Sequence, residues 1–207
     1  MPAAIAINCS LKRSKGEPSS TDRMIALIAG ELAKHDVHLT ETIRIADVDV
    51  KPGVSSDEGD GDAWPDIRGR ILAADILVFG TPIWLGQPSS IAKRVLERMD
   101  AFLSETDDAG RMPSFGKIAV AAIVGNEDGA HRVTADLFQA LNDVGWTIPS
   151  AGACYWVGEA MHKTDFKDLP EPPQEVLQTA RMLAANAAHL ARLLDSAAYP
   201  GVPMSGA

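Results

Sequence analysis

Cysteine is scarce in this chain of 207 residues, and no apolar run approaches the ~20 residues that a membrane-spanning helix needs. The only two cysteines, Cys9 and Cys154, are isolated, which favours a reducing compartment over a disulfide scaffold. The N-terminus has no basic segment ahead of its first apolar run, so we expect no signal peptide. These absences predict a cytoplasmic protein with no membrane partner.

Positive charge is also in short supply. Lys and Arg number 19 against 28 Asp and Glu, which gives a formal net charge of −9 at pH 7. Nucleic acid and anionic membranes are poor partners for such a chain because both are polyanions. The length fits a single domain. We expect residues 1–195 to form it, with 196–207 as a C-terminal tail that is disordered or lies on a partner.

Several ligand motifs are missing as well. The chain has no G-x-x-x-x-G-K-[ST] sequence, and no G-x-G-x-x-G follows its first apolar run, which excludes a P-loop and a typical dinucleotide fingerprint. The five histidines show no metal-ligand spacing. The acidic stretch 51–64 lacks the ligand order of an EF-hand loop. We therefore interpret it as a solvated or lid-like loop, and we expect no metal site.

What the chain does have is a regular alternation of short apolar runs with apolar residues at helical spacing. The expected strands are 3–8, 36–44, 75–79, 117–124 and a segment within 147–156, and the expected helices lie around 24–32, 65–73, 91–102, 137–141 and 175–194. Strands separated by helices run parallel. Because the first, third and fourth runs are continuously apolar, helices should cover both faces of the sheet. The pattern predicts an α/β fold.

Three loops follow the most apolar strands and should therefore share one edge of the sheet, where ligands of parallel sheets bind. Residues 8–21 are rich in hydroxyls and precede a helix, which suits a phosphate group, although an ordinary capped loop has the same composition. Residues 80–90 predict a turn, rich in Gly and Pro, whose unpaired backbone groups suit a flat ligand. Residues 125–129 form the third loop.

Cys9 suggests a different chemistry for the first loop. Its place after the first strand is similar to that of the nucleophile in low-molecular-weight tyrosine phosphatases, which have an Arg six positions later. Here that position is Lys15, and an ammonium replaces a bidentate guanidinium poorly. We interpret Cys9 as a small buried residue and keep the phosphatase as a rival hypothesis.

Together the loops resemble those of the NAD(P)H-dependent FMN reductase family of flavodoxin-like flavoproteins. The strongest match is the run 75–84, which ends in Thr-Pro-Ile-Trp and is followed by Gly86, Ser90 and Lys93. The resemblance covers residues 3–195. It implies a three-layer sandwich with a five-stranded parallel sheet in the order 2-1-3-4-5, FMN as cofactor, NAD(P)H as electron donor, and a homodimer or homotetramer. The chain lacks the cysteine cluster of the related iron–sulfur flavoproteins, so no cluster is expected.

The resemblance also assigns roles to residues. The first loop holds the FMN phosphate, the second wraps the ribityl chain and the polar edge of the flavin, and the third lines the ring. The expected cofactor-binding residues are Ser10, Lys12, Ser20, Thr21, Thr81, Pro82, Ile83, Trp84, Leu85, Gly86, Gly125, Asn126 and Gly129. Trp84 is equally consistent with a core or dimer-interface aromatic. No catalytic side chain is expected because the cofactor carries the chemistry, and His131 is interpreted as a surface helix residue.

The predicted function is an FMN-dependent NAD(P)H oxidoreductase that passes electrons to quinones, flavins or similar small acceptors. The alternative is an FMN-binding electron carrier or redox sensor without nicotinamide turnover. The sequence names neither the acceptor nor a preference between NADH and NADPH.

Overall fold

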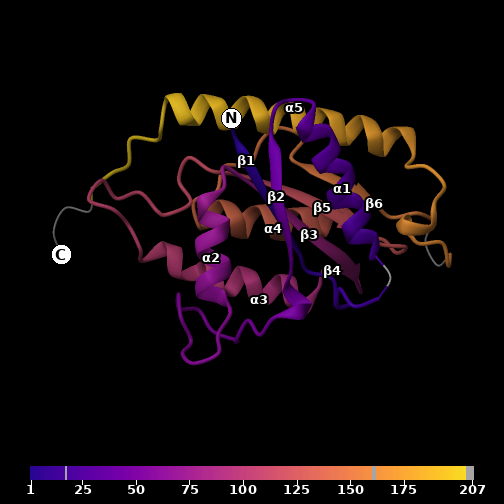
Figure 1. Ribbon diagram of the computed structural model, residues 1–207, viewed down its shortest axis with the longest axis horizontal. Coiled ribbons are helices and arrows are strands. Elements are labelled where there is room, and N and C mark those ends of the chain that lie inside the picture. The colour runs from indigo at the N-terminus through magenta and orange to yellow at the C-terminus, as the bar shows by residue number, and fades with distance from the viewer. Residues whose placement is uncertain (17, 160–161, 204–207) are drawn as a thin grey trace.

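Five parallel strands form the central sheet of the computed structural model, which describes residues 1–16, 18–159 and 162–203 (Figure 1). In sheet order they are β2 His38–Arg44, β1 Ala3–Asn8, β3 Ile76–Trp84, β5 Ile118–Val124 and β6 Ala153–Trp156. A short strand, β4 Gln87–Pro88, pairs antiparallel with the end of β3. The helices are α1 Ser20–Ala33, α2 Trp64–Ala73, α3 Ser90–Met99, α4 Ala130–Asp143 and α5 Gln174–Ser196. When β4 is left out and the five parallel strands are numbered in chain order, the predicted order 2-1-3-4-5 is confirmed.

Helices cover both faces of this sheet, as its apolar strands require. Helices α1 and α5 pack together on one face, and α2, α3 and α4 cover the other (Figure 1). Residues of each strand alternate between the two cores. In β5, for example, Val120 and Ala122 face α1 and α5, whereas Ala119 and Ala121 face the other three helices. The predicted three-layer sandwich is therefore confirmed.

The third strand is longer than predicted. It continues to Trp84, so most of the stretch expected as a turn from Gly80 is strand, and its backbone pairs with β5 as far as Pro82. The missing N–H of a proline is tolerated near the end of a strand. The actual turn is at Leu85 and Gly86, whose φ values are +52° and +70°. The expectation of unpaired backbone groups at residues 80–82 was wrong.

The acidic loop between β2 and α2 is closed around a buried ion pair. The Asp62 carboxylate lies 2.7 Å from Arg98 Nη2 of α3, and both side chains are 0% exposed. Asp62 also accepts hydrogen bonds from the backbone N–H groups of Lys51, Glu58 and Trp64 at 3.2, 2.9 and 3.1 Å. Burial raises the pKa of Asp62, but the bonds from Arg98 and the three N–H groups outweigh it and hold that pKa well below its usual range. The loop is therefore fixed at Asp62 and is not a free lid, whereas residues 52, 54, 55, 57 and 59–61 are exposed, as expected of a solvated loop.

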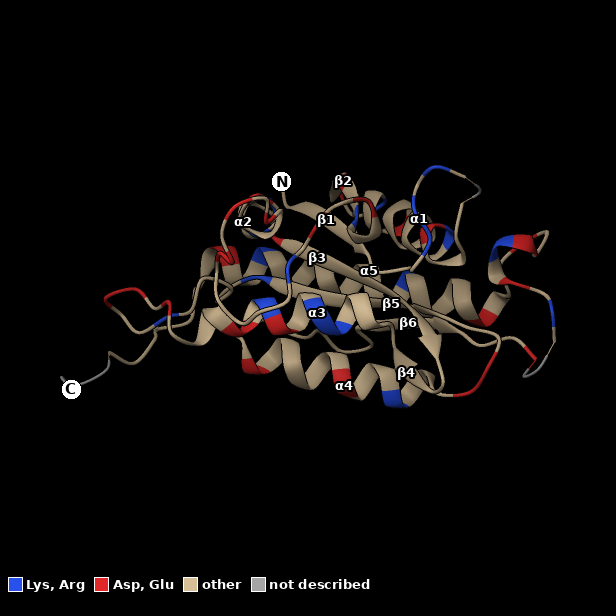
Figure 2. Ribbon diagram, turned by 90° about the horizontal axis from the view of Figure 1, so that it is seen from below, with Lys and Arg blue, Asp and Glu red and all other residues tan. Residues whose placement is uncertain are grey.

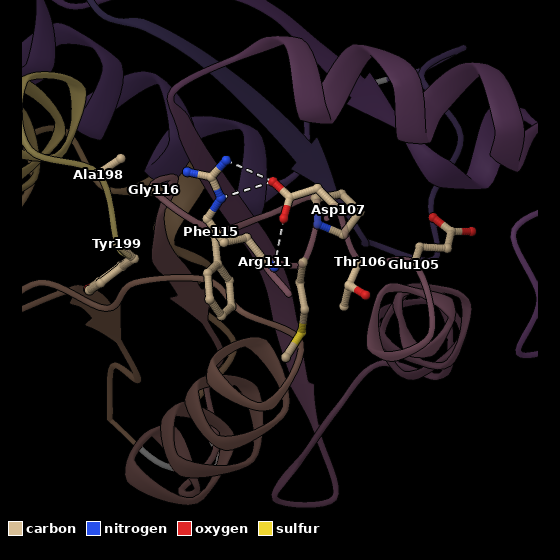
Figure 3. Close-up of a pocket in the computed structure, with 10 residues that line it drawn as sticks. Glu105, Thr106, Asp107, Arg111, Phe115, Gly116, Ala198 and Tyr199 are labelled. Atoms are coloured by element: carbon tan, nitrogen blue, oxygen red, sulfur yellow. Dashed lines mark hydrogen bonds and ion pairs between the residues drawn. The ribbon is translucent and has the colours of Figure 1, made fainter. Parts of the chain in front are cut away.

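The end of the chain folds back onto its own domain (Figure 3). The Tyr199 ring lies edge-on to Phe115 with 5.9 Å between ring centroids, and the Tyr199 hydroxyl is 3.1 Å from Thr147 Oγ1. Phe115 and Tyr199 line a pocket at the edge of the sheet where β5 begins. The tail therefore contacts its own domain through Tyr199, Gly201 and Val202, while 204–207 fall outside the described residues. No helix in the described part of the chain is long and apolar enough to cross a bilayer.

Candidate functional site

A cavity lies at the carboxyl edge of the sheet, where β1, β3 and β5 end. Five segments line it: the loop after β1, the start of α1, the end of β3, the loop after β5, and the segment after β6. The lining residues are Ser10, Leu11, Lys12, Ser19, Ser20, Thr21, Pro82, Ile83, Trp84, Val124, Gly125, Asn126, Trp156, Asp165 and Phe166. The structure thus brings together all the expected cofactor-binding residues except Thr81, Leu85, Gly86 and Gly129.

Helix α1 presents its amino end to this cavity. Ser19 is the N-cap: its Oγ accepts the Asp22 N–H at 3.1 Å, and the Asp22 carboxylate accepts the Ser19 N–H at 2.7 Å, which completes a capping box. The N–H groups of Ser20 and Thr21 have no acceptor among the described residues. Because free N–H groups and the positive end of a helix dipole attract anions, this end suits a phosphate group.

The loop that enters α1 adds positive charge. It carries Lys12, Arg13 and Lys15, and Figure 2 shows it as a blue stretch leading to the helix. Lys12 lines the cavity. In a chain of net charge −9, this local cluster raises the potential where an anion would enter.

Gly80 allows α1 to lie close to the sheet. A Cβ at this position would stand 2.7 Å from Ile25 Cδ1, 2.8 Å from Thr21 Cγ2 and 3.0 Å from the carbonyl oxygen of Ile7. Any other residue would have to displace the Ile25 and Thr21 side chains or the helix itself. Gly80 therefore positions the amino end of α1 rather than shaping a turn.

The end of β3 forms one wall of the cavity through Pro82, Ile83 and Trp84. Trp84 is 55% exposed, so the alternative that it is a core aromatic is wrong. Thr81 is buried and does not line the cavity. Its hydroxyl donates to the Pro82 carbonyl at 3.0 Å and accepts the Ser89 N–H at 3.2 Å. Thr81 thus supports the chain as it passes into α3.

The tip of the β3–β4 hairpin is in contact with the third loop, residues 125–129 after β5. The Leu85 N–H donates to Glu127 Oε1 at 2.8 Å. Gly129 has a φ of +126°, and a Cβ on it would lie 2.7 Å from the Gly86 Cα. Leu85, Gly86 and Gly129 therefore shape the cavity from outside, by fixing the two loops that line it.

The segment after β6 forms the opposite wall through Asp165 and Phe166. Asn126 Nδ2 of the third loop lies 3.4 Å from Asp165 Oδ1, so the two walls meet there. Arg23 of α1 anchors the segment: its Nη1 donates to the carbonyls of Phe166 and Lys167 at 2.9 and 3.0 Å, and its guanidinium lies 5.4 Å from the centre of the Phe166 ring.

Nothing local in the sequence singled out this last wall, because its contacts join residues 143 and 144 positions apart. The available signal was topological. A segment that leaves the carboxyl end of a parallel strand lies at the same edge as the other ligand loops.

Cys9 and His131 take no part in the cavity lining. Cys9 is fully buried, and burial raises the pKa of its thiol far above the usual value, so no thiolate nucleophile is available and the phosphatase hypothesis is not supported. His131 lies at the start of α4, where its Nε2 is 3.0 Å from the Tyr155 hydroxyl. It is exposed, as predicted.

Comparison with known proteins identifies the family of this chain. The profile of NADPH-dependent FMN reductases matches residues 2–160. The chain belongs to this family.

Two relatives of this FMN reductase family member cover nearly the whole chain. The 8-demethyl-8-aminoriboflavin-5'-phosphate synthase of Streptomyces davaonensis is 30% identical over 206 residues, which are 95% of this chain and 79% of the synthase. The divalent metal cation transporter MntH of Mycobacterium bovis is 35% identical over 202 residues, which are 94% of this chain and 29% of that protein. The chain therefore spans less than a third of the transporter's length.

A solved structure is similar over the same range. RosB with its bound intermediate, 8-demethyl-8-formylriboflavin-5'-phosphate, matches with a TM-score of 0.86 and 29% identity, covering 97% of this chain and 82% of RosB. The fold is flavodoxin-like, as predicted. Family membership gives FMN as the cofactor and NADPH as the electron donor of the family.

Proposed function

We propose that the protein takes a hydride from NAD(P)H and passes electrons to a small acceptor such as a quinone or a free flavin. The observation that carries the proposal is that the N–H groups of Ser20 and Thr21, which have no acceptor in the described part of the chain, lie at a cavity in a chain of the FMN reductase family. FMN supplies the hydride and electron chemistry when it is bound. The residues of the chain bind it, orient it and limit the access of water.

The phosphate end of FMN fits the start of α1. The N–H groups of Ser20 and Thr21 would donate to the phosphate, and the Ser20 hydroxyl, which accepts the Lys167 N–H at 3.2 Å, would have its own proton for the same purpose. Ser10 and Lys12 complete the set from the loop. This is a phosphate site built from backbone donors and a helix dipole.

The ring end of FMN fits between the end of β3 and the third loop. A Cβ on Gly125 would lie 3.0 Å from Ile83 Cβ, so glycine keeps these two walls close. The Asn126 side-chain amide offers a donor and an acceptor to the polar edge of the ring. Trp84 is exposed beside the cavity, where it would cover the ring or the acceptor.

We further propose that the protein is a homodimer or homotetramer. Trp84 and Leu85 are 55% and 91% exposed at the hairpin tip beside the cavity. A second copy that covers this tip buries apolar surface and excludes water from the ring. Light scattering at micromolar concentration should give at least twice the monomer mass; a monomer contradicts the proposal.

Anaerobic mixing of the FMN-loaded protein with NADPH, and separately with NADH, tests the function. We expect the visible absorbance of the flavin to bleach with at least one nicotinamide and to recover when a quinone is added. Flavin that stays oxidised with both would support the alternative, an electron carrier or redox sensor.

Similarity to the synthase supports a second candidate, in which FMN is the substrate rather than the cofactor. The relative's name and the RosB intermediate describe flavin phosphates altered at position 8. Mass spectrometry of the flavin released after aerobic incubation with an amine donor separates the two candidates. Unchanged FMN supports the oxidoreductase, and an 8-formyl or 8-amino derivative supports the second candidate.

A further inference from the structure

Arg44, the last residue of β2, contacts three residues at the phosphate end of the cavity. Its Nη1 donates to Ser10 Oγ at 2.9 Å and to the Lys12 carbonyl at 2.9 Å. Its Nη2 forms an ion pair with Asp22. Only 10% of the Arg44 side chain is exposed, so the guanidinium is almost completely withdrawn from water.

The partner of Arg44 is a carboxylate in the first turn of α1, directly after Ser20 and Thr21, whose N–H groups have no acceptor among the described residues. Asp22 accepts hydrogen bonds from Ser19 N at 2.7 Å, Ser19 Oγ at 3.0 Å and Asn8 Nδ2 at 2.6 Å. Burial raises the pKa of Asp22, but the hydrogen bonds from Ser19 and Arg44 and the charge of Arg44 outweigh it and lower that pKa. Asp22 is therefore ionised at neutral pH.

An ionised Asp22 on its own opposes the binding of a phosphate. Like charges repel most strongly where water is excluded, and the phosphate of FMN carries nearly two negative charges at neutral pH. Arg44 cancels the charge of Asp22 at the point where the repulsion would arise. Asp22 can then complete the capping box of α1 without repelling an anion bound at the start of the helix.

Arg44 also keeps one donor unused. Its Nε is buried and has no hydrogen-bond partner within the described ranges. Arg44 is not among the residues that line the cavity, so its part in anion binding is carried by the two residues that it holds, Ser10 and Asp22.

Ser10 is held on both sides by the same network. Its N–H donates to Asn8 Oδ1 at 2.9 Å, and its hydroxyl accepts from Arg44 while contacting the Lys12 carbonyl at 3.3 Å. The Ser10 hydroxyl thus accepts a hydrogen bond from Arg44 and donates its proton to the Lys12 carbonyl, so both contacts fix its position. The loop is thus arranged before any ligand arrives, which lowers the entropic cost of binding.

We propose that Arg44 is a positioning residue that makes the cavity selective for a flavin with a 5'-phosphate, by neutralising Asp22 and fixing the Ser10 hydroxyl. The proposal rests on the proposed FMN site. Riboflavin has the same ring and ribityl chain without the phosphate. The contribution of Arg44 is therefore measured as the difference between the affinities for FMN and for riboflavin.

The test titrates the apoprotein with FMN and with riboflavin by flavin fluorescence. In Arg44→Gln we expect the Kd for FMN to rise by about ten- to hundredfold, the range for losing a charge-assisted hydrogen bond, while the Kd for riboflavin stays within about twofold. Arg44→Lys should recover part of the FMN affinity because it restores the positive charge but not the planar guanidinium that bonds several partners at once. The double variant Asp22→Asn/Arg44→Gln should also recover part of it, because the uncompensated carboxylate is gone.

Two further variants keep the test decisive. Asp22→Asn alone should bind FMN at least as tightly as the wild type, which is measurable even if Arg44→Gln does not fold. Arg70→Gln removes a different arginine that pairs with β2, through Glu41, outside the cavity, and should change neither affinity.

Equal losses for both flavins in Arg44→Gln, or no rescue in the double variant, would show that Arg44 only fastens the loop and would overturn the proposal. These results leave the proposed function intact as long as the wild type binds FMN. A wild type that binds neither flavin overturns the proposed function and this inference together.

Discussion

Two polar loops follow the adjacent strands β1 and β2 at the same edge of the sheet, and they differ in whether their polar groups have partners within the chain. The loop after β1 leads to α1, where the N–H groups of Ser20 and Thr21 have no acceptor in the described part of the chain. The loop after β2 closes around Asp62, which accepts three backbone N–H groups and pairs with the buried Arg98. The first loop leaves donors for a ligand, and the second uses its polar groups within the chain.

The difference shows what makes a polar loop a site. Both loops are rich in polar and charged residues, the first mainly basic and the second mainly acidic, so polarity alone does not show which of them is a site. What separates them is whether the buried polar groups find partners within the chain. A loop that satisfies itself gives stability, and a loop that does not can bind a ligand.

The largest expected effect comes from breaking the closed loop. Asp62→Asn leaves Arg98 buried without a counter-charge, and the free energy of unfolding should fall by about 3–5 kcal/mol. FMN affinity of the folded protein should change by less than about twofold, because the pair lies outside the cavity lining. Urea unfolding measures the first quantity and fluorescence titration the second. Asp60→Asn, an exposed acid of the same loop, is the control and should be nearly neutral.

The same pair predicts a pH dependence. The folded-state pKa of Asp62 lies below its unfolded value of about 4, so its contribution to stability is complete above that pH and is lost as the pH falls through the folded pKa. Wild-type stability should therefore decline below about pH 4, and Asp62→Asn should lack this part of the decline. Identical acid profiles for the two proteins would contradict the buried pair.

Gly80→Ala alters the open loop through its supporting helix. The new Cβ meets Ile25, Thr21 and the Ile7 carbonyl, so these side chains of α1 or the helix itself must shift, and the free energy of unfolding should fall by about 1–3 kcal/mol. FMN affinity should fall by about tenfold because the donors of α1 shift, a change of about 1.4 kcal/mol. Gly30→Ala is the matched control. Gly30 lies in α1 itself, and a Cβ added there would meet no atom within 4 Å. The substitution should therefore raise the free energy of unfolding by up to about 1 kcal/mol.

Arg23→Gln loosens the far wall of the cavity. The variant loses bonds from a charged group to the carbonyls of Phe166 and Lys167, at a cost of about 1–2 kcal/mol that falls mainly on that segment. Hydrogen exchange at residues 164–170 should accelerate more than in the strands. Arg132→Gln, which breaks an exposed pair with Asp136, should leave that exchange unchanged.

Ser19→Ala should have the smallest effect. It removes the N-cap of α1 and should cost about 1 kcal/mol in thermal or urea unfolding. Ser19→Thr retains an acceptor and should recover most of that loss. If both substitutions were equally costly, the hydroxyl would not be acting as a cap.

Periodicity predicted most of the fold because apolar runs and helical stripes follow directly from burial. The end of β3 was mispredicted since Gly80 and Pro82 are turn formers by local preference. In the sheet, Gly80 is needed for the approach of α1, and Pro82 lies near the end of a strand. Tertiary packing decided both positions.

The candidate site was predictable where it follows strands and unpredictable where it depends on distant partners. The loops after β1 and β5 were expected from their position alone. Phe166 depends on Arg23, and Asp62 on Arg98, and no local pattern in the sequence reveals either pairing. Arg44 belongs to the same class, because its partners lie on a neighbouring strand's loop and on α1.

Titration of the purified apoprotein with FMN tests the central claim most directly, namely that the open loop is a phosphate site for a flavin. We predict saturable binding of one FMN per chain, with the flavin absorbance perturbed and riboflavin bound more weakly. Flavin that shows no saturable binding, or riboflavin bound as tightly as FMN, would contradict it.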